Sequence, residues 1–394
     1  MMPPAELRQI LLGLVGTVRH PDLAALTEQD WAVLDAMAAQ HRLQPLLHYQ
    51  HRVNLGIPEN IRNSWAQAFR FQALQALRQQ ADLAATARML QQQGLQPLAL
   101  KGAWLSRFAY PQPAMRPLRD IDLLLDAETV LSGYQTLLDA GYSRATDAEL
   151  PLEDAIRLEK HLPPLFAPGG TCVELHHRLW EPDGRMDHAT PAQIDAAVRA
   201  QAITEADGLA YPAPIDMLAH LIAHAIYSHR LDCGPLLLAD IEFLLKSRPV
   251  DWATFWRRSR QEGWRDGARL VLELVVTHRR EVSIDFSGDD GPAVPPEILA
   301  AAPQLLLQDL TMRKSAGVLA TVHKQGGTGL VNRLLGRRAT TAAPAVQRDM
   351  SAEGGFLGWA TGRLKRTASD LLQRDVRQQA HNLAGLSRWL DRTR

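Results

Sequence analysis

The 394-residue sequence has little cysteine, no long apolar run and no net charge. Its two thiols, Cys172 and Cys233, are far apart and have no metal-ligand spacing. No apolar run approaches the roughly 18 residues that a membrane-spanning helix requires. The start of the chain lacks a basic patch followed by an apolar stretch, so no signal peptide is indicated. We therefore expect a cytoplasmic protein without a membrane span.

The composition excludes the disordered and fibrous classes, because 46% apolar and 22% charged residues are ordinary for a soluble globular protein. The zero net charge nevertheless hides an asymmetry. Residues 313–394 hold 15 basic and 5 acidic residues, whereas the remainder holds 28 basic and 38 acidic residues. A basic segment can attract nucleic acid, an acidic peptide or a lipid surface. We favour the plainer interpretation, a solvated helix face that packs on the acidic body of the same chain.

Residues 1–94 show helical patterns throughout. The string Thr-Glu-Gln-Asp at residues 27–30 predicts a capping box at a helix start. A long helix is predicted to begin at Pro58 and to run towards Gly94, a residue type that often follows a helix end. We expect the apolar stripe of this helix to pack on the core and its glutamines to face solvent.

The pattern changes after residue 94. Residues 95–100 are short and apolar, which predicts a buried strand. A second strand, with acidic residues at its start, is predicted over residues 120–126. Residues 162–167 and 171–175 flank a Pro-Gly-Gly turn and predict a β-hairpin. Helical patterns resume from Pro191.

These patterns predict an α+β fold in which a small mixed β-sheet lies between N-terminal and C-terminal helical regions. Residues 326–358 are rich in Gly, Ala and Thr, which indicates a linker within a basic, partly flexible C-terminal segment that ends in a helix. The expected division is a helical region, a sheet-containing core, a helical domain and the C-terminal segment: 1–94, 95–185, 186–312 and 313–394.

Paired carboxylates are the first candidate site. Asp120 and Asp122 share one face of the predicted strand, because alternate residues of a strand point the same way. Two adjacent carboxylates repel each other unless a cation or a proton offsets their charge. Mg²⁺ is the usual cation, since it binds one or two carboxylates together with phosphate oxygens. Glu174 adds a third carboxylate if its strand pairs beside Asp122; otherwise it faces solvent.

Residues suited to phosphate binding lie around this pair. Lys101 and Gly102 follow a buried strand, where glycine lets backbone approach a phosphate and lysine supplies a point charge. Arg116 and Arg119 lie in the loop just before the carboxylates, within reach of a triphosphate. The alternative for both arginines is a surface ion pair with an acidic residue at position 126 or 128.

Histidines give weaker signals. His176 shares the strand face of Glu174 and is a candidate contact of the nucleotide or acceptor. His220 and His224 have the helical spacing of two metal ligands. Leu221 stands where the metalloprotease motif has glutamate, and we favour hydrogen-bonded core histidines at both positions.

Five strings of the chain resemble one protein family. They are residues 98–104 (Leu-Ala-Leu-Lys-Gly-Ala-Trp), 110–111 (Tyr-Pro), 116–124 (Arg-Pro-Leu-Arg-Asp-Ile-Asp-Leu-Leu), 141–142 (Gly-Tyr) and 173–176 (Val-Glu-Leu-His). Together they are similar to the uncharacterised bacterial nucleotidyltransferase family, part of the DNA polymerase beta-like nucleotidyltransferase superfamily. The resemblance extends over residues 30–285.

This resemblance implies transfer of a nucleoside monophosphate from an NTP, with ATP the expected donor, to an acceptor, with release of pyrophosphate. Asp120 and Asp122 would be ligands of Mg²⁺ or Mn²⁺, and Glu174 would be the third carboxylate. Gly102 would correspond to the superfamily's glycine turn near the triphosphate. These roles suit a two-metal in-line displacement at the α-phosphate.

The sequence does not indicate the acceptor, and we expect a hydroxyl or other group on a small molecule, a peptide or a protein. Two alternatives stay open. A protein of this fold could bind nucleotide as a catalytically silent scaffold, although the intact carboxylate trio argues against it. A nucleic-acid-modifying enzyme is less favoured, because only the basic C-terminal segment supports it and no recognised RNA-binding motif is present.

Overall fold

The structure, a computed structural model, describes residues 2–18, 21–144, 152–180, 190–310, 313, 317 and 374–392. The chain forms two compact units. The first comprises Met1–Ser228 and Pro235–Ala293 and contains the β-sheet, and the second comprises His229–Gly234 and Val294–Arg394. The four-part division that the sequence indicates stays a prediction.

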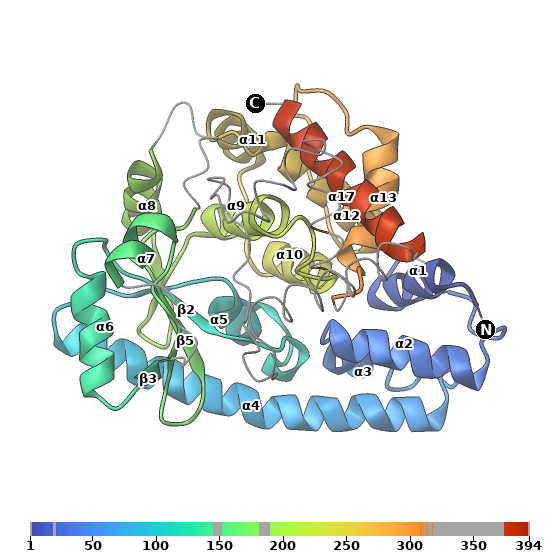
Figure 1. The fold of residues 1–394 in the computed structure, drawn as a ribbon, viewed down its shortest axis with the longest axis horizontal. Coiled ribbons are helices and arrows are strands. Elements are labelled where there is room, and N and C mark those ends of the chain that lie inside the picture. Colours follow the sequence, from blue (N-terminus) through green and yellow to red (C-terminus); the bar gives the residue numbers. More distant parts are fainter. Residues whose placement is uncertain are drawn as a thin grey trace, which may run out of the picture. The chain divides into compact units, whose positions relative to one another are not determined.

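Helices predominate over short strands in the first unit (Figure 1). Its helices are α1 (Pro4–Val15), α2 (Glu28–Gln40), α3 (Gln44–His51), α4 (Glu59–Gln92), α5 (Gly102–Trp104), α6 (Val130–Asp139), α7 (Leu152–Leu158), α8 (Pro191–Ala200), α9 (Pro214–Ala223), α10 (Leu236–Ser247), α11 (Trp252–Gln261) and α12 (Arg265–His278). Short helical turns of other types are η1 (Leu105–Ala109), η2 (Pro113–Met115) and η3 (His224–Ser228). The strands are β1 (Leu98–Ala99), β2 (Ile121–Leu124), β3 (Ser143–Arg144), β4 (Leu165–Phe166), β5 (Cys172–His176), β6 (Ile203–Thr204) and β7 (Ala210–Tyr211).

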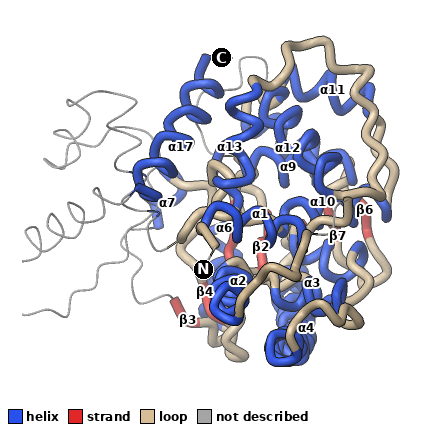
Figure 2. Tube along the Cα trace, turned by 90° about the vertical axis from the view of Figure 1, so that its right-hand side faces the viewer, coloured by secondary structure: helices blue, strands red, loops and turns tan. Residues whose placement is uncertain are grey.

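The described strands form one seven-stranded mixed sheet in the order β3-β4-β5-β2-β1-β7-β6. At its centre, β2 pairs with β5 in parallel and with β1 in the antiparallel direction. β4 and β5 form the predicted hairpin, which is therefore confirmed. In Figure 2, β3 and β6 lie on opposite sides of the view, as the two ends of this order should. The α+β fold class is confirmed.

The hairpin of β6 and β7 is missing from the sequence prediction, which assigned helix from Pro191 onward. β7 pairs in parallel with β1, with Leu98 opposite Ala210, and so extends the sheet beyond its predicted core. Strands of two residues are too short to produce a period-two pattern, which explains the error.

Local signals place the N-terminal helices correctly. α2 begins with the predicted capping box, in which Thr27 Oγ1 accepts from the Asp30 amide at 3.2 Å and Asp30 Oδ2 accepts from the Thr27 amide at 3.0 Å. α4 begins directly after Pro58, and Gly94 follows its end with a φ of 77°. Both predicted boundaries are confirmed.

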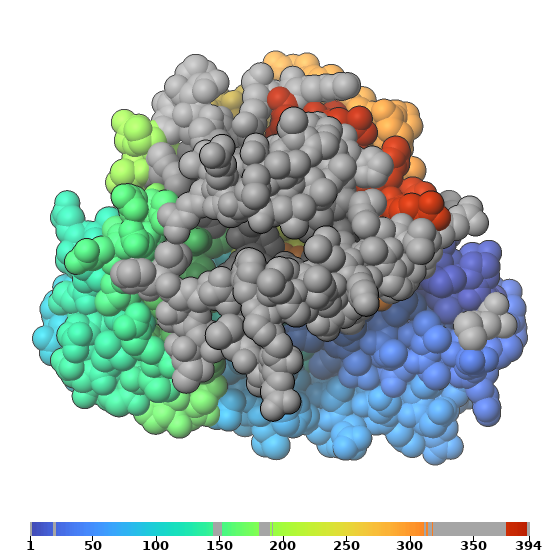
Figure 3. All heavy atoms as spheres, in the orientation of Figure 1, coloured from blue at the N-terminus to red at the C-terminus, as the bar shows by residue number. Residues whose placement is uncertain are grey.

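The expected facing of α4 is wrong in part. Gln79 is buried, and its Nε2 donates to the Leu118 carbonyl at 3.2 Å. Phe71, Leu74 and Leu77 are instead exposed on this helix, which forms the light-blue lower margin in the view of Figure 3. A helix of 34 residues contacts different elements along its length, and the side facing them is set by those contacts rather than by its glutamines.

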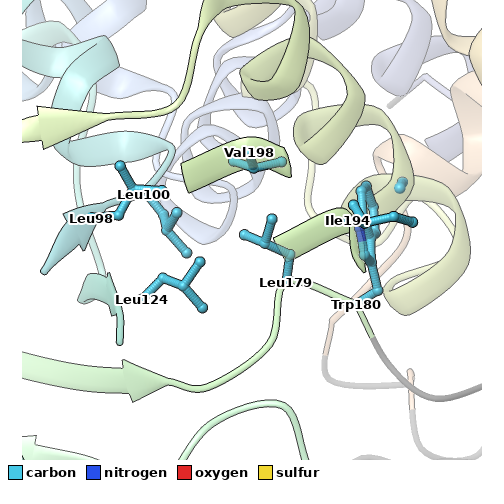
Figure 4. Packing of buried hydrophobic residues seen from close by; sticks show 8 residues of the cluster. Leu98, Leu100, Leu124, Leu179, Trp180, Ile194 and Val198 are labelled. Atoms are coloured by element: carbon cyan, nitrogen blue, oxygen red, sulfur yellow. The ribbon is translucent and has the colours of Figure 1, made fainter. Parts of the chain in front are cut away.

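A compact apolar cluster lies beside the central strands (Figure 4). It includes Leu124 of β2 and Ile194 and Val198 of α8. Leu124 shares a strand face with Asp122, because a single residue separates them in the strand. The face that carries the candidate carboxylates therefore continues directly into buried hydrocarbon.

The second unit contains α13 (Pro296–Leu306) and α17 (Arg374–Arg392), which pack together. Gln379 Nε2 donates to Gln308 Oε1 at 2.6 Å, and Asn382 Nδ2 donates to Gln304 Oε1 at 2.8 Å. The predicted linker at residues 326–358 lies outside the described residues. Of the helices that the structure describes, none is long and apolar enough to cross a membrane.

Candidate metal and nucleotide site

Two neighbouring parallel strands bring the predicted carboxylates together. The register places Asp122 of β2 directly opposite Glu174 of β5. His176 shares the face of Glu174, and its Nε2 lies 3.1 Å from Asp122 Oδ1 and 3.6 Å from Glu174 Oε2. The strand pairing on which a role for Glu174 depends is therefore present.

Three side chains of this face can hold a metal ion together. Asp122, Glu174 and His176 each offer one ligand atom, and these atoms all lie within 4.8 Å of one another. No other such group of three occurs among the described residues. The trio predicted from the sequence has Asp120 in place of His176. Asp120 precedes β2 by one residue, on the same side as Asp122 by strand alternation.

Lys101 closes one side of this group. It is buried, and its Nζ lies 3.4 Å from Asp122 Oδ2 and 3.5 Å from His224 Nδ1. Its backbone has a φ of 38°, in the left-handed region that a residue with a side chain seldom adopts. Such strain persists where the surrounding structure holds it and often accompanies function. Lys101 thus combines a strained backbone with a contact to Asp122, a carboxylate of the candidate centre.

The ionisation of the carboxyls shows how the charges are balanced. Burial raises the pKa of Asp120, and the negative charges of Asp122 and Glu174 raise it further, to about 7. Burial acts in the same direction on Asp122, but Lys101 and His176 outweigh it and hold the pKa of Asp122 well below its usual value. The chain's own cations thus suffice for Asp122 but not for Asp120.

The other two members of the trio stabilise each other's charged forms. Burial opposes the charge of Glu174, yet the hydrogen bond from His176 and the nearby His161 lower the Glu174 pKa. Burial likewise opposes protonation of His176, but the charge of Asp122 and its hydrogen bond raise the His176 pKa. In this arrangement a protonated imidazole offsets part of the negative charge.

The donor set fits a divalent cation. Two carboxylates supply the oxygen ligands that Mg²⁺ prefers, and Mn²⁺ also accepts an imidazole such as that of His176. Burial and then the negative charges of Asp122 and Glu174 raise the pKa of Asp120, and Lys101 and His176 do not offset them. A cation bound between the carboxylates would compensate these negative charges.

A comparison with protein families shows which family the chain belongs to. A family model described as "Uncharacterised nucleotidyltransferase" matches residues 27–278, well over half of the sequence. The chain belongs to this nucleotidyltransferase family. No curated protein and no solved structure matches it significantly. The assignment supports nucleotidyl transfer as the general activity, with an NTP as donor and a divalent metal.

In this nucleotidyltransferase, Arg116 has a buried carboxylate partner. Its Nε and Nη2 each lie 2.9 Å from an oxygen of Asp240 on α10, and the Tyr110 hydroxyl donates to the same carboxylate at 2.7 Å. Asp126, one of the surface partners considered from the sequence, pairs instead with Arg199 at 2.9 Å. A role of Arg116 in phosphate binding stays a prediction.

Gly102 is required by the space around it. A Cβ there would overlap the Arg116 guanidinium and would lie 2.6 Å from Leu118 Cδ2. Glycine thus lets Arg116 pass close to the turn that follows β1. Contact of Gly102 with a triphosphate stays a prediction.

Arg119 differs from Arg116 although both belong to the same loop. Its side chain is exposed, and no carboxylate among the described residues forms an ion pair with it. It precedes Asp120 by one residue and is free to contact a bound anion.

His176 and its neighbour His177 point in opposite directions, as strand alternation requires. His177 points away from the trio, with its Nε2 3.0 Å from the Ile156 carbonyl. His220 is buried against Trp180 and His224, at ring distances of 5.6 and 6.2 Å. Neither ring nitrogen of His220 has a hydrogen-bond partner among the described residues, so the expectation of a hydrogen-bonded core histidine is wrong at this position. Neither His220 nor His224 belongs to a metal-capable group of three within the described part of the chain.

His161 is a site residue that sequence reasoning missed. Its Nε2 lies 3.6 Å from Glu174 Oε2, and its ring centre lies 5.1 Å from that of His176. It immediately precedes the first segment of the predicted hairpin and forms a bridge with His176. The β4–β5 register, extended outward, would put His161 opposite His177. Its bridge to His176 therefore reflects a one-residue shift that the sequence does not show.

Proposed function

We propose that the protein is a Mg²⁺- or Mn²⁺-dependent nucleotidyltransferase that transfers a nucleoside monophosphate from an NTP, ATP in the first instance, to a small molecule, peptide or protein. One observation carries this proposal beyond the family assignment. Asp122 and Glu174 lie opposite each other on adjacent parallel strands. Asp120 precedes β2 by one residue, on the side of Asp122 by strand alternation. This is the arrangement of acidic ligands that a triphosphate-bound metal requires.

In the proposed reaction, the acceptor oxygen forms a bond to the α-phosphorus of the NTP. The bond between the α-phosphorus and the bridging oxygen to the β-phosphate breaks, and pyrophosphate leaves with that electron pair. The acceptor proton is lost to water. Bound divalent cations would stabilise the charge on the phosphates and lower the pKa of the acceptor hydroxyl.

The chain's own residues prepare the site for this chemistry. Asp122 and Glu174 would hold the metal, and Asp120 would complete its ligand set. His176 contacts both carboxylates and fixes their positions. Lys101 holds Asp122 ionised and adds positive charge beside the phosphates. Partial burial of Asp122, Glu174 and His176 reduces solvent screening, which strengthens their electrostatic interaction with substrate.

The proposal is tested by incubating the protein with each of the four α-³²P-labelled NTPs, Mg²⁺ or Mn²⁺, and pools of metabolites or peptides as acceptors. We expect labelled acceptor and equimolar pyrophosphate with the wild type. Asp122→Asn should lower both by about a thousandfold or more, because it removes a charged ligand. Glu128→Gln, which alters an exposed acidic residue shortly after β2, is the matched control and should retain activity.

Other outcomes would reject this function. Tight NTP binding without pyrophosphate release under any condition would instead support a scaffold. Label transfer confined to RNA, with binding that weakens steeply as salt rises, would support a nucleic-acid-modifying enzyme.

A further inference from the structure

Arg42 occupies a backbone position that suits glycine. α2 ends at Gln40, and the Arg42 amide donates to the Ala39 carbonyl at 3.0 Å while the Leu43 amide donates to the Ala38 carbonyl at 2.7 Å. This pair of hydrogen bonds is the Schellman motif, in which the residue after the helix cap is left-handed. The φ of Arg42 is accordingly 56°.

Other helix ends of the chain use the same motif with the expected residue. Gly94, Gly141 and Gly263 follow α4, α6 and α11, make the same two hydrogen bonds and have φ values of 77°, 89° and 71°. Glycine adopts this conformation without steric cost, whereas arginine does not. Arg42 therefore differs from the glycine found at these three helix ends.

Among the described residues, no hydrogen bond or ion pair of the Arg42 side chain offsets the strain of its backbone. Its Nε is buried and has no hydrogen-bond partner, and no carboxylate among the described residues forms an ion pair with it. A buried donor without a partner is costly. A strained backbone and an unpaired guanidinium at one residue indicate a functional rather than a structural requirement.

Arg42, Arg116 and Arg119 form a cationic group near Asp120, at the edge of the carboxylate centre made by Asp120, Asp122 and Glu174. α3, which begins two residues later, packs on η2, the turn that leads into the loop of Arg116 and Arg119. Burial and then the charges of Arg119 and Arg116 lower the pKa of Arg42 to about 10, so it stays protonated at neutral pH. The negative charge of Asp120 acts to raise the pKa of Arg42.

The charges of Arg42, Arg116 and Arg119 are not all balanced by carboxylates of the described residues. Asp240 binds Arg116 through two hydrogen bonds, which leaves the guanidiniums of Arg42 and Arg119 for another anion. The nearby Asp120 is itself a candidate metal ligand. Two unpaired guanidiniums at the edge of a metal centre fit a polyphosphate, whose oxygens accept forked hydrogen bonds from arginine.

We propose that Arg42, together with Arg119, binds the β- and γ-phosphates of the NTP on the Asp120 side of the carboxylate centre. This inference rests on the proposed function. The α-phosphate reacts at the metal-binding carboxylates, so the phosphates that extend past Asp120 are the two that leave as pyrophosphate. Arg42 thereby gives the N-terminal helices, outside the sheet, a direct part in substrate binding.

The test uses Arg42→Gly in the full-length protein, because this change separates the two roles. Glycine suits the left-handed position, so the variant should unfold at the same or higher urea concentration than wild type. Its affinity for Mg²⁺-bound α,β-methylene-ATP and for inorganic tripolyphosphate should fall about ten- to a hundredfold, while AMP affinity should not change. Arg42→Lys should recover part of the loss. Arg52→Ala, at the other end of α3, should bind like wild type.

Each outcome decides the matter. Unchanged tripolyphosphate and nucleotide binding by Arg42→Gly would overturn the phosphate role, as would a loss of affinity that merely follows a loss of stability. If wild type transfers label and Arg42→Gly binds normally, only this inference fails. If wild type binds no nucleotide but tripolyphosphate binding still depends on Arg42, the anion site stands and the proposed nucleotidyl transfer fails.

Discussion

Asp122 and Glu174 are register partners on adjacent parallel strands, and the imidazole of His176 contacts both of their carboxylates. This relationship joins two distant parts of the chain into one anionic face. After burial, the pKa of Asp120 depends on the charges of Asp122, Glu174 and Lys101, and the pKa of Asp122 depends on Lys101 and His176. The behaviour of the centre should therefore respond strongly to one added or removed charge.

Divalent metal should stabilise the folded protein. A ligand that binds only the native state adds about 2.7 kcal/mol at a hundredfold excess over its dissociation constant. We expect Mn²⁺ or Mg²⁺ to raise the melting temperature of the wild type by several degrees, as measured by calorimetry with and without EDTA. Asp122→Asn should abolish this rise and Glu128→Gln should retain it. An equal rise in the Asp122→Asn variant would place the metal elsewhere.

Arg116 and Arg119 should behave differently although they lie in one loop. Asp240→Asn leaves the half-buried Arg116 guanidinium without a counter-ion, which should lower the free energy of unfolding by about 2–4 kcal/mol. Arg119→Ala changes an exposed residue and should alter stability by less than about 0.5 kcal/mol while weakening NTP binding. Urea denaturation and nucleotide titration of both variants check this. Equal stability of the two variants would refute the buried ion pair as a structural link.

Gly102→Ala should destabilise the turn after β1. The added methyl group overlaps Arg116 and approaches Leu118, and overpacking of this kind costs about 1–3 kcal/mol. Gly385→Ala is the control, because a Cβ there would only touch Ile298 at 4.0 Å within a helix. Thermal unfolding of both variants measures the difference. A Gly102→Ala protein as stable as wild type would show that Arg116 can move aside freely.

Asp195 on α8 should give stability a distinct pH dependence. Burial raises the pKa of its carboxyl to about 6, above the unfolded value of 3.8. Between about pH 4 and pH 6, the folded state holds a proton that the unfolded state has lost. The free energy of unfolding is therefore higher at low pH and falls as the pH rises from about 4 to 6. Asp195→Asn should remove roughly 2 kcal/mol of this fall. Denaturation curves at pH 4 and pH 7 test it, and a variant that parallels wild type at both would contradict it.

Local chemistry allowed much of the fold and part of the site to be predicted. The capping box at Thr27, the turn glycine after α4 and the Pro-Gly-Gly hairpin each depend on a few neighbouring residues. Strand alternation likewise placed Asp122 and His176 on site-facing positions. These features are set by backbone geometry over a short stretch, which the sequence shows directly.

The remaining features depend on contacts between distant segments. Nothing near Arg116 in the sequence indicates that Asp240 is its partner, because Asp240 lies on α10, 124 residues further along the chain. His161 enters the site through its bridge to His176. No sequence pattern distinguishes Arg42 from other arginines, because its left-handed φ is visible only in the folded chain. Register and tertiary packing decide all three.

The most direct test of the central claim compares α-³²P-labelled and γ-³²P-labelled NTP in parallel reactions with Mg²⁺ or Mn²⁺. Nucleotidyl transfer at the Asp122–Glu174 centre predicts that the α label enters the acceptor while the γ label appears only in pyrophosphate. Glu174→Gln should abolish both signals. Transfer of the γ label to the acceptor, or α-label transfer that survives in Glu174→Gln, would contradict the account.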